Sequence, residues 1–246
     1  MSDIGMRRVV GLTAIAGGVV ALVGNLVHPR YSGDDVDVYR SIASSSLVRT
    51  ADVFIIFAFI LVAAALVGFA RIWGSRGRTT LLGYYGSMAA VAGAALGLAG
   101  IAIDLFAYKE QAEQFVRADG RNIVSAFWAT NAIDHINSAM LDITTLVLLG
   151  LAPLLIASAQ LLERANAPRL SLTGVAGGAV CVVVGVVGLL IRDQSNINIP
   201  FLVGSLLVTV WVLATGVHLL QTPDVIDITD DERAEKLMKA EERQRG

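Results

Sequence analysis

The chain has little charge, and this shortage narrows its class. Only 16% of its 246 residues are Asp, Glu, Lys or Arg, and 55% are hydrophobic, whereas about 25% charged residues are usual in a soluble domain. The formal net charge is −2 at pH 7, and the sequence has no basic stripe that would neutralise nucleic-acid phosphates. The composition therefore favours a membrane protein and indicates no nucleic-acid partner.

Cysteine and histidine are also scarce. Cys181 is the only cysteine, so the chain can form neither an intramolecular disulfide nor an iron–sulfur site. The three histidines, His28, His135 and His218, form no His-x-x-x-His or Glu-x-x-His pair of the kind that binds metals on helices. Nucleophile and phosphate-loop motifs are absent as well. The sequence therefore assigns no metal site, no cofactor and no catalytic residue, and it does not favour an enzyme.

Long apolar runs are what the chain has in abundance. They cover about residues 9–27, 53–70, 81–107, 139–160, 170–191 and 199–220. Each is near the ~20 residues that a helix needs to cross about 30 Å of hydrocarbon, and each is apolar on every side. We therefore predict an all-α polytopic membrane protein, with a six-helix transmembrane domain over residues 1–222 and a charged tail over residues 223–246.

An even number of spans places both termini on one side of the membrane. Outside the tail, Lys and Arg residues between and beside the spans are equally numerous on the two sides, and the basic residues of the tail tip the balance towards cytoplasmic termini. The tail opens with a capping box, Thr229-Asp-Asp-Glu232, which predicts a short charged cytoplasmic helix. We therefore expect a multi-pass protein of the cytoplasmic membrane with both termini inside.

A sequence repeat suggests how the spans pair. Leu12-Thr-Ala-Ile-Ala-Gly-Gly-Val-Val20 matches Leu172-Thr-Gly-Val-Ala-Gly-Gly-Ala-Val180, and both open odd-numbered spans. We predict three helical hairpins, each with a small-residue helix followed by a bulkier one. Gly93-x-x-x-Gly97 and Gly174-x-x-x-Gly178 predict close helix packing. This packing favours a tight six-helix bundle, with a homo-oligomer interface as the alternative.

Two longer connections lie on the predicted outer side. Residues 28–51 contain a turn and a short helical pattern at about Val38–Leu47. Residues 108–138 show a helical pattern, a break at Asp119-Gly120 and a second helix that continues directly into the fourth span. Pro153 within that span predicts a kink, because it removes a hydrogen bond and crowds the preceding turn.

Polar residues gather at this outer end. Asn131, His135, Ser138 and Asp142 are spaced four, three and four residues apart, so one helix face carries all of them. Asp142 and Asp104 have apolar neighbours in the sequence, and carboxylates are costly in a bilayer. We predict an outward-facing polar pocket with these two carboxylates at its floor. The further members of this predicted ligand or proton site are Arg49, Asp52 and His28, of which Arg49 and Asp52 also fit a simple interfacial ion pair.

Three short strings carry a family resemblance. They are Arg8-Val-Val-Gly-Leu12 at the first span, Arg49-Thr-Ala-Asp52 at the second, and Pro168-Arg-Leu-Ser-Leu-Thr-Gly174 at the fifth. In them the chain resembles a bacterial family of six-span membrane proteins that is known only as a domain of unknown function. The resemblance implies a bacterial membrane protein of this architecture, and it brings no reaction, cofactor or catalytic residue.

Three functions remain open at this point. The first is an accessory membrane subunit or a protein that binds a small or lipid-like molecule in the outward-facing pocket. The second is a small proton-linked transporter that uses Asp142, His135 and Asp104. The third is a membrane haem or metal redox protein, with His28, His135, Asp104 and Asp142 as candidate metal ligands and the histidines, His218 included, as candidate haem ligands. The expected partners are the lipid bilayer, a small-molecule or lipid ligand, and either a second membrane protein or another copy of this chain.

Overall fold

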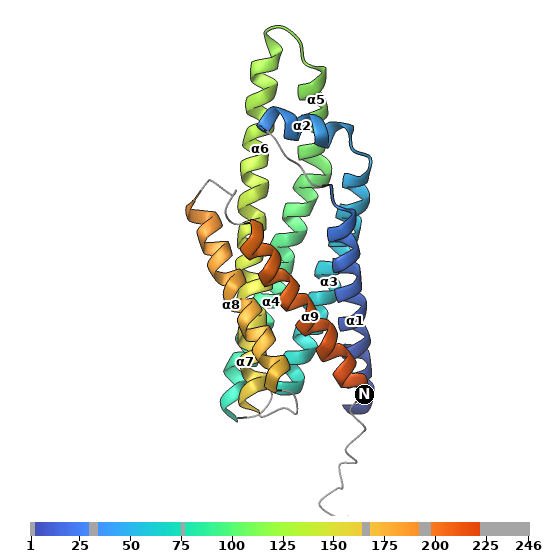
Figure 1. The fold of residues 1–246 in the computed structure, drawn as a ribbon, viewed down its shortest axis with the longest axis vertical. Coiled ribbons are helices and arrows are strands. Elements are labelled where there is room, and N and C mark those ends of the chain that lie inside the picture. Colours follow the sequence, from blue (N-terminus) through green and yellow to red (C-terminus); the bar gives the residue numbers. More distant parts are fainter. Residues whose placement is uncertain (1–2, 30–33, 75–76, 164–167, 192–197, 222–246) are drawn as a thin grey trace, which may run out of the picture.

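The predicted spans are present as helices in the computed structural model of the chain (Figure 1). The structure describes all residues except 1–2, 30–33, 75–76, 164–167, 192–197 and 222–246. Within the described part there are helices and no strand, and six of the helices are long and apolar enough to cross a membrane. The all-α polytopic fold is therefore confirmed, whereas the predicted C-terminal helix lies outside the described residues.

The bundle is built from continuous and segmented spans. Four spans are single helices: α1 (Asp3–Val27), α3 (Leu47–Trp73), α8 (Pro168–Leu190) and α9 (Asn198–Gln221). The third span consists of α4 (Thr80–Ala102), the π-helical turn η2 (Ile103–Tyr108) and α5 (Lys109–Arg117). The fourth consists of α6 (Asn122–Thr144), the π-helical turn η3 (Thr145–Leu151) and α7 (Ala152–Leu162). The helix α2 (Asp35–Ser44) and the short 3-10 turn η1 (Gly77–Thr79) belong to the connections.

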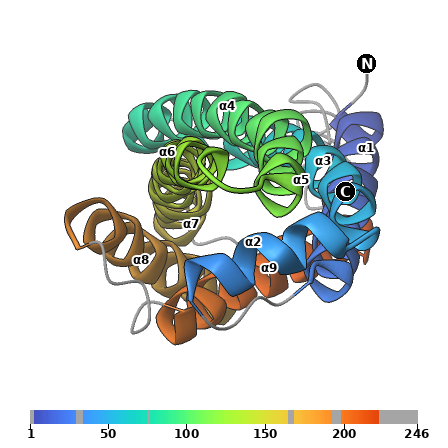
Figure 2. The same ribbon diagram turned by 90° about the horizontal axis from the view of Figure 1, so that it is seen from above.

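Consecutive spans pack against each other as hairpins. α1 packs on α3, α8 packs on α9, and α4 packs on α6, η3 and α7. α9 also returns to α1 (Figures 1 and 2), where a Cβ at Gly11 would lie 2.9 Å from the Gly216 carbonyl oxygen. The start of α1 and the end of α9 therefore lie at one end of the bundle, as an even number of spans requires.

Small residues allow the helices to approach closely at the predicted positions. A Cβ at Gly93 of α4 would lie 2.6 Å from the backbone nitrogen of Leu148, and one at Gly178 of α8 would lie 2.7 Å from that of Leu154. Lipid supplies no hydrophobic drive between helices, so such close backbone contacts contribute the packing energy. The large buried side chains Phe69 and Trp211 fill the core between these contacts.

Two spans extend beyond the predicted apolar runs at one end of the bundle. The third span continues to Arg117 and reaches 38 residues, and the fourth begins at Asn122 and reaches 41. The break at Asp119-Gly120 is confirmed, because Gly120 has a φ of +49° that favours glycine. Both spans project past the rest of the bundle (Figure 1), and we call this the α2 end because α2 packs there.

The predicted irregularity at Pro153 takes the form of a wider helical turn. Pro153 lies in the first turn of α7, directly after η3. Proline cannot donate a hydrogen bond to the carbonyl four residues earlier, and a π-helical turn is one way in which a helix accommodates such an interruption.

Candidate functional site

The α2 end of the bundle has its own small core. The buried side chains Tyr39, Ile42, Tyr108, Ala112 and Phe115 bring α2 against η2 and α5. The Tyr39 ring meets the rings of Tyr108 and Phe115 edge to face, with centroids 6.1 and 5.8 Å apart. α2 begins at Asp35, earlier than the predicted Val38, because Asp34 caps it by accepting a hydrogen bond of 3.0 Å from the Asp37 backbone.

Lys109 fixes the other end of α2. Its side chain is only 6% exposed, and Nζ donates hydrogen bonds to the carbonyl oxygens of Ile42, Ala43 and Ser45 at 3.1, 3.3 and 2.9 Å. A lysine is favourable there because a helix C-terminus carries unpaired carbonyls and partial negative charge. Glu113 lies 3.5 Å from the same ammonium. These contacts hold α2 in place over the bundle.

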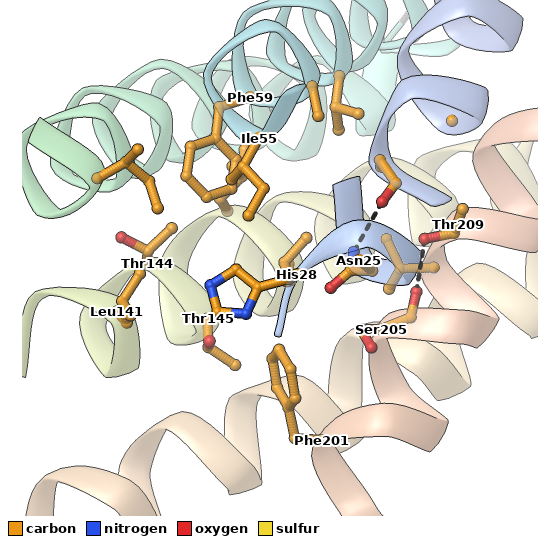
Figure 3. A pocket seen from close by; sticks show the side chains of 18 of the residues that line it. Asn25, His28, Ile55, Phe59, Leu141, Thr144, Thr145, Phe201, Ser205 and Thr209 are labelled. Atoms are coloured by element: carbon orange, nitrogen blue, oxygen red, sulfur yellow. Dashed lines mark hydrogen bonds between the residues drawn. The ribbon is translucent and has the colours of Figure 1, made fainter. Parts of the chain in front are cut away.

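A cavity of about 320 Å³ lies inside the bundle (Figure 3). α1, α3, α4, η2, α6, η3 and α9 all contribute to its wall, which is mainly apolar. The hydroxyls of Thr144 and Thr209 donate to carbonyl oxygens of their own helices, at 2.7 Å to Met140 and 2.8 Å to Ser205. These hydroxyl protons are therefore already used, and Asn25, His28 and Asp104 supply amide, imidazole and carboxylate groups to a wall that also contains Thr145 and Ser205. We call the part of the cavity lined by Asn25, His28 and Asp104 its polar end.

His28, Asp52 and Asp104 converge at this polar end. One ligand atom from each side chain lies within 4.8 Å of the other two. His28 follows α1, Asp52 lies near the start of α3, and Asp104 lies in η2, so three spans meet in this cluster. We call these three residues the His–Asp–Asp cluster. Nitrogen and carboxylate oxygen donors in this arrangement can bind a divalent cation or share protons.

Asp52 is the least expected member of the cluster. It is 0% exposed, and neither of its carboxylate oxygens has a hydrogen-bond partner. Arg49, its predicted interfacial partner, is exposed and forms no ion pair with it within the part of the chain that the structure describes. The Asp104 carboxylate acts on Asp52 by repulsion and does not compensate its charge. Arg49 therefore does not explain the burial of Asp52.

A second, more open cavity lies between α6 and the end of α8. It has a volume of about 520 Å³, and its lining residues are Asp35, Asn131, Asp134, His135, Ser138, Ala139, Asp142, Gly188 and Leu189. The four residues that were predicted to share a helix face do line this one groove. Asp142 packs closely on α8, because a Cβ at Gly188 would lie 2.5 Å from its Oδ1.

The predicted site is therefore divided between two cavities. Asp104 and His28 line the inner cavity, whereas Asp142 and His135 line the groove. Two members of the groove make local contacts: Asn131 donates a hydrogen bond of 3.2 Å to the Tyr39 hydroxyl, and His135 Nδ1 lies 2.7 Å from the Asn131 carbonyl oxygen. Burial raises the pKa of Tyr39 above its ordinary value of 10.0, so the folded protein favours the neutral hydroxyl.

Sequence reasoning missed Asp134 and Lys109. Asp134 lies half-buried near Tyr108 and His135, and Lys109 holds α2. A lysine placed two residues past an apolar run looks like an ordinary interfacial charge. Only the position of α2, which local sequence does not encode, reveals that Lys109 is buried.

No protein-family model, curated protein or solved structure matches the chain. The resemblance to a six-span family therefore stays a prediction, and the functional argument rests on the geometry of the two cavities.

Proposed function

We propose that this integral membrane protein binds a small, mainly apolar molecule in the inner cavity, with the polar end of the molecule at Asn25, His28 and Asp104. The observation that carries this proposal is the contrast between the mainly apolar wall and the few polar side chains in it, among them His28 and Asp104. Ligand sites are commonly apolar cavities with a few polar groups that fix orientation.

The size of the cavity limits the ligand. About 320 Å³ is near the lower end of the range of roughly 300–1,000 Å³ for small-molecule sites. A single acyl chain or a compact lipid-like molecule fits this description better than a complete two-chain phospholipid. Ile55, Phe59, Leu141 and Phe201 are among the apolar side chains that line the cavity (Figure 3), so a bound chain would contact apolar groups along most of its length.

Thermal unfolding in nanodiscs with linear primary alcohols of increasing chain length tests this function. The midpoint of unfolding should rise with chain length up to a cut-off at which the cavity is full. Thr209→Trp should remove this chain-length dependence, since Thr209 lines the cavity and an indole would occupy it. An unchanged response in Thr209→Trp, or the same small shift for every chain length, contradicts the proposal.

Leu206→Trp is the matched control for that experiment. Leu206 lies on the same helix, is 50% exposed and does not line the inner cavity. It adds the same indole to a lipid-facing position, so its response to the alcohols should equal that of the unsubstituted protein.

Proton-linked transport through the outer groove is the second candidate. Asp142 is half-buried there beside His135 and Ser138, and no hydrogen bond or ion pair to its carboxylate occurs among the described residues. If the protein transports protons, proteoliposomes that contain it should show proton movement under an imposed pH gradient. Asp142→Asn should abolish that movement, and Asp104→Asn, in the other cavity, distinguishes a groove-only pathway from one that uses both carboxylates.

The proposed function also depends on the orientation of the chain in the membrane. We propose that the protein lies in a bacterial cytoplasmic membrane with its termini inside, which places the α2 end and both cavities towards the exterior. The basic residues of the tail support this orientation. In a Cys181→Ala background, Arg121→Cys at the exposed α2 end should react with a membrane-impermeant maleimide added to intact cells; protection until lysis would reverse the orientation.

A further inference from the structure

The His–Asp–Asp cluster has the composition and geometry of a metal site. Its three ligand atoms come from three different spans and lie within 4.8 Å of one another. Two ligands on one zinc-like ion are about 3.4 Å apart in a tetrahedral site and at most about 4.2 Å apart, given metal–ligand distances of about 2.1 Å. Side-chain rotations that close the cluster by about 1 Å would therefore bring all three atoms to one ion.

The burial of Asp52 points to a missing partner. Its carboxylate is 0% exposed, and neither oxygen accepts a hydrogen bond. Buried polar groups normally have a partner, and a buried charge needs one most. The neighbouring acid, Asp104, is 8% exposed and adds repulsion rather than compensation.

The charged side chains nearest in sequence do not supply that partner. Arg49 is exposed, and Lys109 is committed to the carbonyl oxygens of α2 and to Glu113. A divalent cation would balance the two carboxylates and leave a site with no net charge. Charge neutralisation of this kind stabilises a membrane domain strongly, because unpaired charges there have a high free-energy cost.

His28 can supply the third ligand atom of the cluster. Its Nδ1 lies 3.0 Å from the Pro29 carbonyl oxygen. A carbonyl oxygen can only accept, so in the neutral ring the proton is on Nδ1 and the lone pair is on Nε2. Metal-binding histidines characteristically use one ring nitrogen as ligand while the other donates to a carbonyl or carboxylate.

The helix that carries Asp104 is irregular at this point. Asp104 lies in η2, and π-helical turns inside α-helices occur frequently at functional sites. This turn is the second observation, after the unpartnered carboxylate, that sets the cluster apart from ordinary interfacial acids.

We propose that His28, Asp52 and Asp104 bind a divalent transition-metal ion of the zinc class. One nitrogen and two carboxylate oxygens suit zinc better than calcium or magnesium, which prefer oxygen ligands alone. Three protein ligands leave at least one coordination position for water or another donor. His28 and Asp104 line the inner cavity, so that position faces the cavity.

Co²⁺ titration of the purified full-length protein in nanodiscs, after removal of metals with a chelator, tests the proposal. The expected result is one equivalent of bound Co²⁺ with the visible absorption of a low-coordinate site, displaced by Zn²⁺. Asp52→Asn keeps the side-chain volume and removes a ligand, so it should weaken Co²⁺ binding by more than the about 10- to 100-fold that loss of a supporting contact causes.

Two further variants keep the test decisive. Asp104 is less buried than Asp52, so Asp104→Asn can be used even if Asp52→Asn folds poorly. It should weaken Co²⁺ binding as strongly as Asp52→Asn. Asp142→Asn removes a carboxylate from the outer groove and should bind Co²⁺ as the unsubstituted protein does. Absence of stoichiometric binding in the unsubstituted protein, or an equal loss in Asp142→Asn, overturns the metal site. The test uses the metal alone, so its failure would leave the alcohol experiment unaffected.

Discussion

Lys109 Nζ donates a hydrogen bond of 2.9 Å to the carbonyl oxygen of Ser45, the C-cap residue that follows α2. This contact joins a buried ammonium on the third span to the connection between the first two. It holds α2 over the end of the bundle at which both cavities have their polar residues. The position of α2 is therefore part of the architecture of the site.

Lys109→Met should loosen α2 selectively. The substitution removes the side-chain donor from three carbonyls at the end of α2, of which only that of Ile42 keeps a backbone donor, and it costs about 1–3 kcal/mol. Hydrogen exchange measured by mass spectrometry should show faster exchange in residues 35–44 and unchanged exchange in the core spans. Arg117→Met is the control, because it removes an exposed partner of Glu113 worth about 0–1 kcal/mol. Equal effects of the two substitutions would show that the buried contact has no special weight.

Gly93→Ala should destabilise the bundle. The added methyl would lie 2.6 Å from the Leu148 nitrogen, a backbone atom that cannot move alone, and overpacking of this kind costs about 1–3 kcal/mol. Gly100→Ala on the same helix is the comparison, since its nearest neighbour is a side-chain carbon at 3.3 Å. Thermal unfolding in one detergent should rank Gly93→Ala well below Gly100→Ala, and the reverse order would contradict the close approach.

The buried pair Gln160 and Trp211 should be energetically coupled. Trp211 Nε1 donates a hydrogen bond of 3.1 Å to Gln160 Oε1, and both residues are fully buried. Trp211→Phe leaves the amide oxygen without a donor, at a cost of about 1–3 kcal/mol. In a double-mutant cycle with Gln160→Leu, the second substitution should recover part of that loss. Additive effects would mean that this hydrogen bond contributes nothing measurable.

Ionisation of Tyr39 at alkaline pH should destabilise the packing of α2 on the bundle. Burial raises its pKa in the folded protein above the ordinary value of 10.0, so the folded state favours the neutral hydroxyl. The resulting stability is fully present below pH 10 and is lost as pH rises through the higher folded pKa. The difference in tyrosinate absorbance between the unsubstituted protein and Tyr39→Phe should therefore titrate above pH 10, and a transition at or below pH 10 would contradict the buried position.

Much of the fold can be predicted from the chain because a bilayer imposes a simple rule. An apolar run of sufficient length must be helical to satisfy its backbone, and glycines such as Gly93 and Gly178 mark where helices meet. The break at Gly120 has an equally local cause in its positive φ.

The division of the site could not be predicted in this way. Helical spacing places Asn131, His135, Ser138 and Asp142 on one face, and they do share one groove. Spacing within one helix carries no information on which other spans that face meets. The sequence around Asp104 therefore does not indicate that this residue lies beside His28 and Asp52 rather than beside Asp142. That proximity depends on the packing of three spans and on the π-helical turn in the third.

Photo-cross-linking tests the central claim, that the inner cavity binds an apolar chain, most directly. A fatty alcohol with a terminal diazirine would be incorporated into nanodiscs that contain the full-length protein, activated by light and mapped by mass spectrometry. The account predicts labels on cavity-lining residues such as Phe59 and Val208, with loss of those labels in Thr209→Trp and not in Leu206→Trp. Labels confined to lipid-facing residues such as Leu202, unchanged by Thr209→Trp, would contradict it.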